Sequence, residues 1–272
     1  MENRTLTPYF GKMSLAQAWE GDYDLLAQAG MPTKQLGFLR DICEDVPTEP
    51  ATVYNFLVED DPLFRSIYGS GRFCGSCHEF FVYPFVVDKK IPEDIEEVCG
   101  PIGIQTSKWH KETIQQHVGL VAANLVDAGI SEDLAVTLSV LHDIGKKYTT
   151  ATNKVGAICA YNHGKVSAFI AGHWLRQIYS QWMAKEIVAT IYGHMLPHDT
   201  WNVTTHWKTG EPVDYRRDFY EGELLSYCDN DKAFADRIMS LIDIFSECDR
   251  GVSEFNPIIL ERITRGQELI CE

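Results

Sequence analysis

The sequence contains no long apolar run. No stretch of its 272 residues approaches the roughly 20 consecutive apolar positions that a membrane-spanning helix needs. The N-terminal stretch MENRTLTPYFGKMSLAQAW also lacks the basic and then apolar layout of a signal peptide. We therefore expect a cytoplasmic protein without a membrane-spanning segment, in which the eight cysteines stay reduced.

Basic residues are also scarce, with 24 Lys and Arg against 39 Asp and Glu and a formal net charge of −15. Proteins that hold long nucleic acids do so with patches of Lys and Arg, so this balance argues against such a partner. It leaves room for a small phosphorylated ligand, which a metal ion and a few local cations could hold. The 45% hydrophobic fraction is ordinary for a globular protein with a sizeable core.

A second Cys-x-x-Cys pair is missing. Cys74, Cys77 and His78 have the spacing of a c-type haem attachment, but that chemistry normally needs an exported chain. A structural zinc ion on these side chains and Cys99 is a better functional interpretation. Without a second pair, reduced cysteines in an aromatic core remain the favoured one.

Periodic apolar residues predict helices over most of the chain from Lys108 onward, and no internal repeat is present. The predicted helices are 108–129, 131–145, 165–179, 183–194, 219–229 and 232–247. Between them, residues 195–218 read as a long aromatic loop that could act as a lid. The sequence therefore predicts a predominantly helical, all-α fold.

The first hundred residues are more mixed. One helix is predicted over Ser14–Ala29 and another from Lys34, with a break between them. Thr48 is a candidate cap for a further helix. Residues 69–87 are Gly-rich and then aromatic, which favours a short hairpin or an irregular segment.

Polar side chains share the apolar faces of four of the predicted helices. His117, His142 and His194 follow the apolar stripes of their helices, Asp143 is next to His142, and Asp229 ends another apolar helix. A single inward histidine is more often hydrogen-bonded in a core than a ligand. Five such groups together favour a metal centre, because imidazole and carboxylate are the usual ligands of Zn, Fe, Mn and Ni ions.

The order of these residues resembles the HD-domain superfamily. LHDIGK carries His142 and Asp143, TIQQHVGLVA carries His117, and YNHGKVSAFIAGHWL carries a further histidine, His163. An ordered series of such motifs is a specific signal, whereas the pair His-Asp alone would carry no information.

Two later segments continue the resemblance. IYGHM resembles the segment with a further histidine, His194, and LLSYCDNDK resembles the closing segment with Asp229. Cys228 stands where the family usually has alanine. The similarity spans about residues 108–240 and leaves the first hundred residues unaccounted for.

The resemblance implies an HD-domain-like helical bundle with a mixed N-terminal extension. It divides the chain into an extension of unknown function packed on the core (1–105), a metal-binding helical domain (106–250) and a C-terminal helix (251–272). It also implies a first metal site with four ligands: His117, His142, Asp143 and Asp229. His163 and His194 match the extra ligands of the two-metal branch, with Asp143 bridging both ions.

In function, the resemblance implies a metal-dependent phosphohydrolase with two divalent transition metal ions (Fe, Mn, Ni or Zn). Its substrate would be a phosphomonoester or phosphodiester, such as a nucleotide or a small phosphorylated metabolite, cleaved by a metal-activated hydroxide. Asp143 and Lys146 are the expected catalytic residues, with Lys146 facing the phosphate charge. Lys165 and Arg216–Arg217 are weaker candidates for that cation.

Two alternatives remain open at this point. The same ligand order resembles the HD-fold mixed-valence di-iron oxygenases, which cleave C–C or C–P bonds with O₂. A third interpretation is a non-catalytic domain that binds metal for stability or sensing. Ligand identity alone does not separate them, because these divalent ions share imidazole and carboxylate sites.

Overall fold

Helices make up most of the part of the chain that the computed structural model describes, which confirms the predicted all-α fold. The described residues are 5–44, 114–152, 156, 158–196, 204–205, 212–213 and 215–249. Within them, two short antiparallel pairs join β1 (Ala151–Thr152) to β2 (Ile158–Cys159) and β3 (Thr204–Thr205) to β4 (Pro212–Val213).

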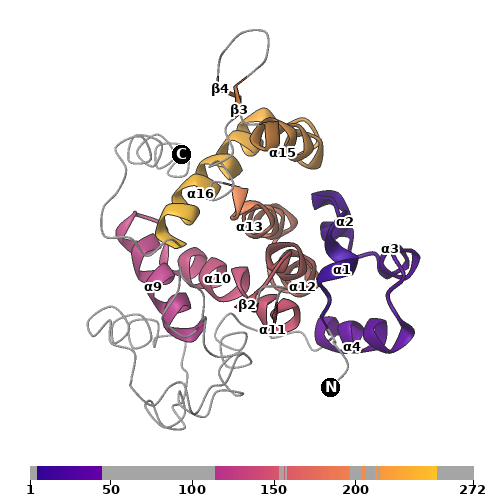
Figure 1. Cartoon of the computed structure of the whole chain (residues 1–272). Helices are drawn as coiled ribbons and strands as arrows, with labels where there is room; N and C mark the ends of the chain where they lie inside the picture. Colours follow the sequence, from indigo (N-terminus) through magenta and orange to yellow (C-terminus); the bar gives the residue numbers. More distant parts are fainter. Residues whose placement is uncertain are drawn as a thin grey trace.

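One helix, α12 (His163–Ile178), lies in the middle of the described bundle (Figure 1). It packs against three helices that are close to it in the sequence: α10 (Glu132–His142), α11 (Lys146–Thr149) and α13 (Gln181–Gly193). Its apolar and small residues are almost all buried, among them Phe169 and Trp174. A helix that is apolar on most of its surface needs neighbours on several sides, which explains its central place.

Three further helices close the bundle on the far side of α10 and α13. They are α9 (Ile114–Asp127), α15 (Tyr215–Tyr227) and α16 (Lys232–Asp249). In Figure 1, α16 crosses from α15 to α9, and it contacts α9, α13 and α15. Because α16 continues two residues beyond its predicted end, Asp249 is part of the helix and lies on the side of α9.

The N-terminal part consists of four helices on one side of α12 (Figure 1). They are α1 (Thr7–Phe10), α2 (Leu15–Glu20), α3 (Tyr23–Gln28) and α4 (Thr33–Glu44). The rings of Phe10 and Tyr23 both meet Phe169 edge-on, with centroids 5.5 Å away. Residues 5–44 therefore share one apolar core with the helices that follow Ile114.

The single helix predicted over Ser14–Ala29 is wrong, because the chain breaks at Gly21. Ser14 caps α2 in a capping box with Gln17, as helix N-termini often do. Gly21 then adopts a left-handed conformation (φ 68°), and a Cβ atom there would lie 2.4 Å from Nε2 of His173. Asp22 caps the next helix, so the segment forms two helices.

Gly145 also has a different role from the predicted one. The helix α10 already ends at His142, and Gly145 instead precedes α11. A Cβ atom at Gly145 would lie 2.3 Å from the carbonyl oxygen of His163. The backbone N–H of Gly145 donates to Ser167 Oγ at 2.9 Å. The glycine therefore lets the chain after His142 and Asp143 approach α12 closely.

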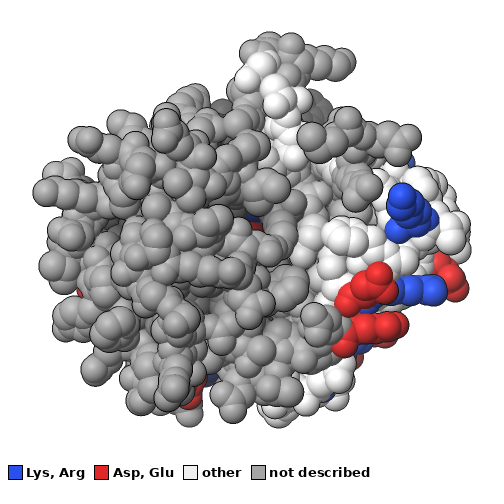
Figure 2. Space-filling model, turned by 90° about the horizontal axis from the view of Figure 1, so that it is seen from below, with Lys and Arg blue, Asp and Glu red and all other residues white. Residues whose placement is uncertain are grey.

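Several predicted features lie outside the described residues. These are the helix after Thr48, the segment 69–87 with its cysteines, the central part of the 195–218 loop, and the C-terminal helix over 251–272. Of the helices that the structure describes, none has the length and apolarity to cross a membrane. Where Figure 2 shows described charged residues, Lys or Arg and Asp or Glu lie next to one another instead of forming a patch of one sign.

The buried ring of Phe169 generates a stability prediction. Replacing Phe169 with alanine removes the ring that Phe10 and Tyr23 contact, and the free energy of unfolding should fall by about 3–5 kcal/mol. The same replacement at Phe219, which is 74% exposed, should change it by less than about 0.5 kcal/mol. Chemical denaturation of both variants checks this, and equal effects would contradict the packing described here.

Candidate metal centre

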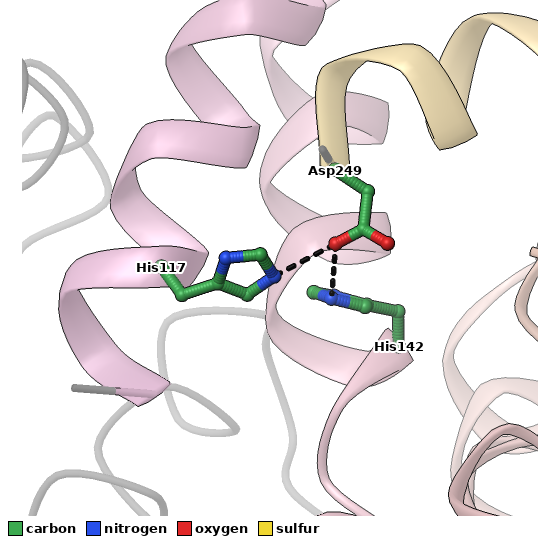
Figure 3. Close-up of side chains that lie close together, drawn as sticks. All are labelled: His117, His142 and Asp249. Carbon is green, nitrogen blue, oxygen red and sulfur yellow. Dashed lines mark hydrogen bonds and ion pairs between the residues drawn. The ribbon is translucent and has the colours of Figure 1, made fainter. Parts of the chain in front are cut away.

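Three buried side chains from three helices meet at one end of the bundle (Figure 3). His117 comes from α9, His142 ends α10 and Asp249 ends α16. Oδ1 of Asp249 lies 2.7 Å from Nε2 of His117 and 3.4 Å from Nε2 of His142. Each residue offers one ligand atom, and these atoms lie within 4.8 Å of one another, so the group can hold a metal ion.

A second buried group lies beside the first. It contains Asp143, His163 at the start of α12, and His194 just after α13. Nε2 of His163 lies 3.3 Å from Oδ1 of Asp143 and 3.1 Å from Nε2 of His194. These ligand atoms also lie within 4.8 Å of one another.

The carboxylate of Asp143 faces both groups. Its Oδ2 atom lies 3.2 Å from Nε2 of His142 and 3.6 Å from Nε2 of His117. Its Oδ1 atom faces His163 in the second group. Asp143 is therefore in the position that a bridging carboxylate would need.

Backbone carbonyl groups set the orientation of three of the four histidines. Nδ1 of His142 lies 2.7 Å from the carbonyl oxygen of Ser139, Nδ1 of His163 is 2.8 Å from that of Ala160, and Nδ1 of His194 is 2.6 Å from that of Ile191. A carbonyl oxygen can only accept a hydrogen bond, so each Nδ1 carries a proton. In the neutral rings, Nε2 is then an unprotonated lone-pair donor, as in metal-ligating histidines.

These orientations bring electron-pair donors against one another in a buried space. Neutral His163 and His194 present two Nε2 lone pairs only 3.1 Å apart, with no proton between them. Among the described residues, Nε2 of His142 and Oδ1 of Asp143 are buried without a hydrogen-bond partner, although other ligand atoms lie 3.2 and 3.3 Å away. Buried donors that only repel one another are unfavourable, and a cation between them would remove the conflict. The donor set therefore fits a metal ion.

Electrostatics within the two groups agree with this. Burial alone would lower the pKa of His142, but the carboxylates of Asp143 and Asp249 outweigh it and raise that pKa to about 9. Burial lowers the pKa of His163 to about 4 and that of His194 to about 3, so both rings are neutral at pH 7. In the first group, a proton on His142 can offset the negative charge of the carboxylates. In the second group, His163 and His194 stay neutral and their two Nε2 lone pairs still face one another.

The pKa of Asp143 shifts in the opposite direction from the one that its burial favours. Burial would raise it, but the charges of His142 and Lys146 hold it well below its usual range. Asp143 is therefore a carboxylate at neutral pH, which is the form that binds metal ions. Lys146 contributes through its Nζ atom, 2.5 Å from Oδ2 of Asp143.

Two small residues next to the histidines are needed for this geometry. A Cβ atom at Gly164 would lie 2.9 Å from Cε1 of His194 and 3.2 Å from its Nδ1. Ser246 on α16 donates its hydroxyl to the carbonyl oxygen of His194 at 2.7 Å. The close approach at Gly164 lets His194 reach His163, and Ser246 holds the end of α13 in place.

The structure places Asp229 elsewhere, so the ligand set expected from the sequence needs one correction. Asp229 lies in the turn between α15 and α16 with φ 56°, its side chain is 89% exposed, and its Oδ2 pairs with Lys185 Nζ at 3.2 Å. Asp249, at the opposite end of α16, takes the expected place beside His117 and His142. The other five predicted ligands do come together.

The sequence does contain a signal for Asp249, which lies outside the segments that resemble the family motifs. Asp249 lies four residues after Phe245 and seven after Ile242, both fully buried, so it follows the apolar stripe of α16. The same rule selected His117, His142 and His194.

The weaker cation candidates have other partners. Lys165 donates to the carbonyl oxygens of Gly11 and Met13, both at 2.9 Å. Arg217 forms a two-pronged ion pair with Asp243 at 2.8 and 2.9 Å. The side chain of Arg216 lies outside the described residues.

Comparisons with protein families, with curated proteins and with solved structures find no match to this chain.

Separate replacement of Asp249 and of Asp229 tests the metal centre. Asp249→Asn replaces a charged ligand by a neutral amide, so the chain should lose about one bound ion after reconstitution. Asp229→Asn is the matched control and should bind as many ions as the unmodified chain, because Asp229 points to solvent. Elemental analysis of the purified variants measures the difference. A loss of metal in Asp229→Asn alone would reverse the assignment.

Proposed function

We propose that this protein is a metal-dependent phosphohydrolase of the HD-domain type that acts through two metal ions. The observation that carries the proposal is the pair of buried groups joined by Asp143, with their lone pairs turned inward. When bound, two such ions lower the pKa of a water molecule and neutralise the oxygens of a phosphoryl group. The ordered motifs around His117, His142, Asp143, His163 and His194 support the same family.

In this proposal, the protein's own residues hold the reacting geometry. The carbonyl groups of Ser139, Ala160 and Ile191 orient three imidazoles before any ligand arrives. The six side chains of the two groups are all buried, so bulk water does not screen the charges between them. Such fixed dipoles need little rearrangement during a reaction, which is the main source of transition-state stabilisation in many enzymes.

Lys146 supports a substrate with a phosphate group. Its Nζ atom pairs with Oδ2 of Asp143, and its side chain is 12% exposed whereas that of Asp143 is almost fully buried. An incoming phosphate would meet this charge, and Lys146 could turn from Asp143 to the developing negative charge.

The oxygenase alternative shares the same nitrogen and oxygen ligands, so only reaction chemistry separates the two. The deciding experiment is a panel of phosphomonoesters and phosphodiesters with protein reconstituted separately with Mn²⁺, Fe²⁺, Ni²⁺ or Zn²⁺, with and without O₂. The proposal expects anaerobic hydrolysis of at least one ester class, and its loss in Asp143→Ala with the fold retained. Turnover only with iron and O₂ would support the oxygenase, and no turnover in any condition would support a non-catalytic domain.

A second prediction concerns Lys146. Lys146→Met should lower kcat for the ester that the panel identifies by about 100-fold, because one charge on the transition state is lost. The metal content should remain unchanged, because Lys146 is not a ligand. Lys232→Met is the control, since that side chain is 77% exposed and pairs with Asp236 one turn further along the same helix. Unchanged kcat in Lys146→Met would remove Lys146 from the proposed mechanism.

A further inference from the structure

The turn that precedes α12 has an unusual backbone. Residues 160–163 form a tight turn closed by a hydrogen bond from the His163 N–H to the carbonyl oxygen of Ala160, at 3.3 Å. Asn162 is the third residue of this turn and adopts a left-handed conformation, with φ 62° and ψ 17°. Asparagine tolerates this region better than most residues other than glycine.

The turn also sets the orientation of the His163 ring. The Ala160 carbonyl oxygen that closes the turn accepts a second hydrogen bond from His163 Nδ1, at 2.8 Å. The direction of this carbonyl group depends on the conformation of the turn, and so does the direction in which Nε2 of His163 points. Nε2 in turn faces Asp143 and His194.

The side chain of Asn162 connects this turn to the N-terminal arm, which we define as residues 5–13. Nδ2 of Asn162 donates to the carbonyl oxygen of Thr7 at 3.1 Å. The hydroxyl of Thr7 reaches the carbonyl oxygens of Tyr161 at 3.1 Å and Thr149 at 3.2 Å. Thr7 therefore joins the turn before His163 to the end of α11, the helix that follows Asp143 in the chain.

The arm lies on the side of the second group. α1 packs against α12, and in Figure 1 it is on the opposite side of α12 from α9 and α16. His117 and Asp249 of the first group come from α9 and α16. A change in the arm or in the turn should therefore reach His163 and leave the first group in place.

We infer that Asn162 is a positioning residue for His163, through which the N-terminal arm controls how tightly the group of Asp143, His163 and His194 holds its ion. This rests on the proposed function, since it takes each of the two groups to bind a metal ion. Residues that orient a ligand through a hydrogen bond typically change metal affinity by about 10- to 100-fold when they are replaced. The arm would then act on the second ion selectively.

The test is a metal titration of the full-length apo protein with Co²⁺, followed by absorption spectroscopy and by elemental analysis. Asn162→Asp keeps the size of the side chain and its tolerance of positive φ, but it can no longer donate to Thr7. Asn162→Gly keeps only the backbone conformation. Asn230→Asp is the matched control, because Asn230 also has a positive φ (66°) but is exposed in the turn before α16.

The inference expects the second Co²⁺ equivalent to bind about tenfold or more weakly in Asn162→Asp and in Asn162→Gly, with the first equivalent unchanged. Asn230→Asp should match the unmodified protein. A merely structural role would weaken both equivalents together or neither, and either result would overturn the inference. If the unmodified protein binds fewer than two ions, the proposed dinuclear centre is wrong as well. If it binds two ions and the Asn162 variants bind both as tightly, only the role of Asn162 is wrong.

Discussion

Six buried side chains turn lone pairs and carboxylate oxygens toward a common space, and the fold around them is arranged to keep them there. The central member is Asp143, whose two oxygens face different histidine groups. Neutral His163 and His194 turn their Nε2 atoms toward one another at 3.1 Å. Burying such groups lowers stability unless a partner compensates, and metal binding is the usual compensation.

Helix ends supply most of these side chains. His142 and Asp249 end α10 and α16, His163 begins α12, and His194 follows α13. At the C-terminal end of a helix the last backbone carbonyl groups have no partner within the helix, and His142 and His194 each use one to hold their ring. His163 begins α12, and its ring is held by the Ala160 carbonyl group of the turn before that helix.

Close packing of the helices depends on small residues at defined places. Gly145 lets the chain after Asp143 touch the start of α12, and Gly164 makes room for His194. A methyl group at either position would have to displace neighbouring atoms, and overpacking of this kind costs about 1–3 kcal/mol. These glycines link the local sequence to the spacing between the two groups.

The sequence predicted the helical fold, and the apolar stripes of the helices indicated that His117, His142 and His194 are buried. Asp143 followed as the neighbour of His142, and His163 came from the motif resemblance. That resemblance pointed to Asp229 for the sixth side chain, whereas Asp249 follows the stripe of α16 at its last turn. The break at Gly21 and the hydrogen bond from Asn162 to Thr7 depend on contacts between distant segments. Periodicity within one helix carries no information about such contacts.

The most direct test of the central claim is a crystal of the metal-reconstituted protein, measured at the absorption edge of the added metal. We expect two anomalous peaks, one among His117, His142 and Asp249 and one among Asp143, His163 and His194. No peak at these side chains, or a peak at Asp229 instead, would contradict it.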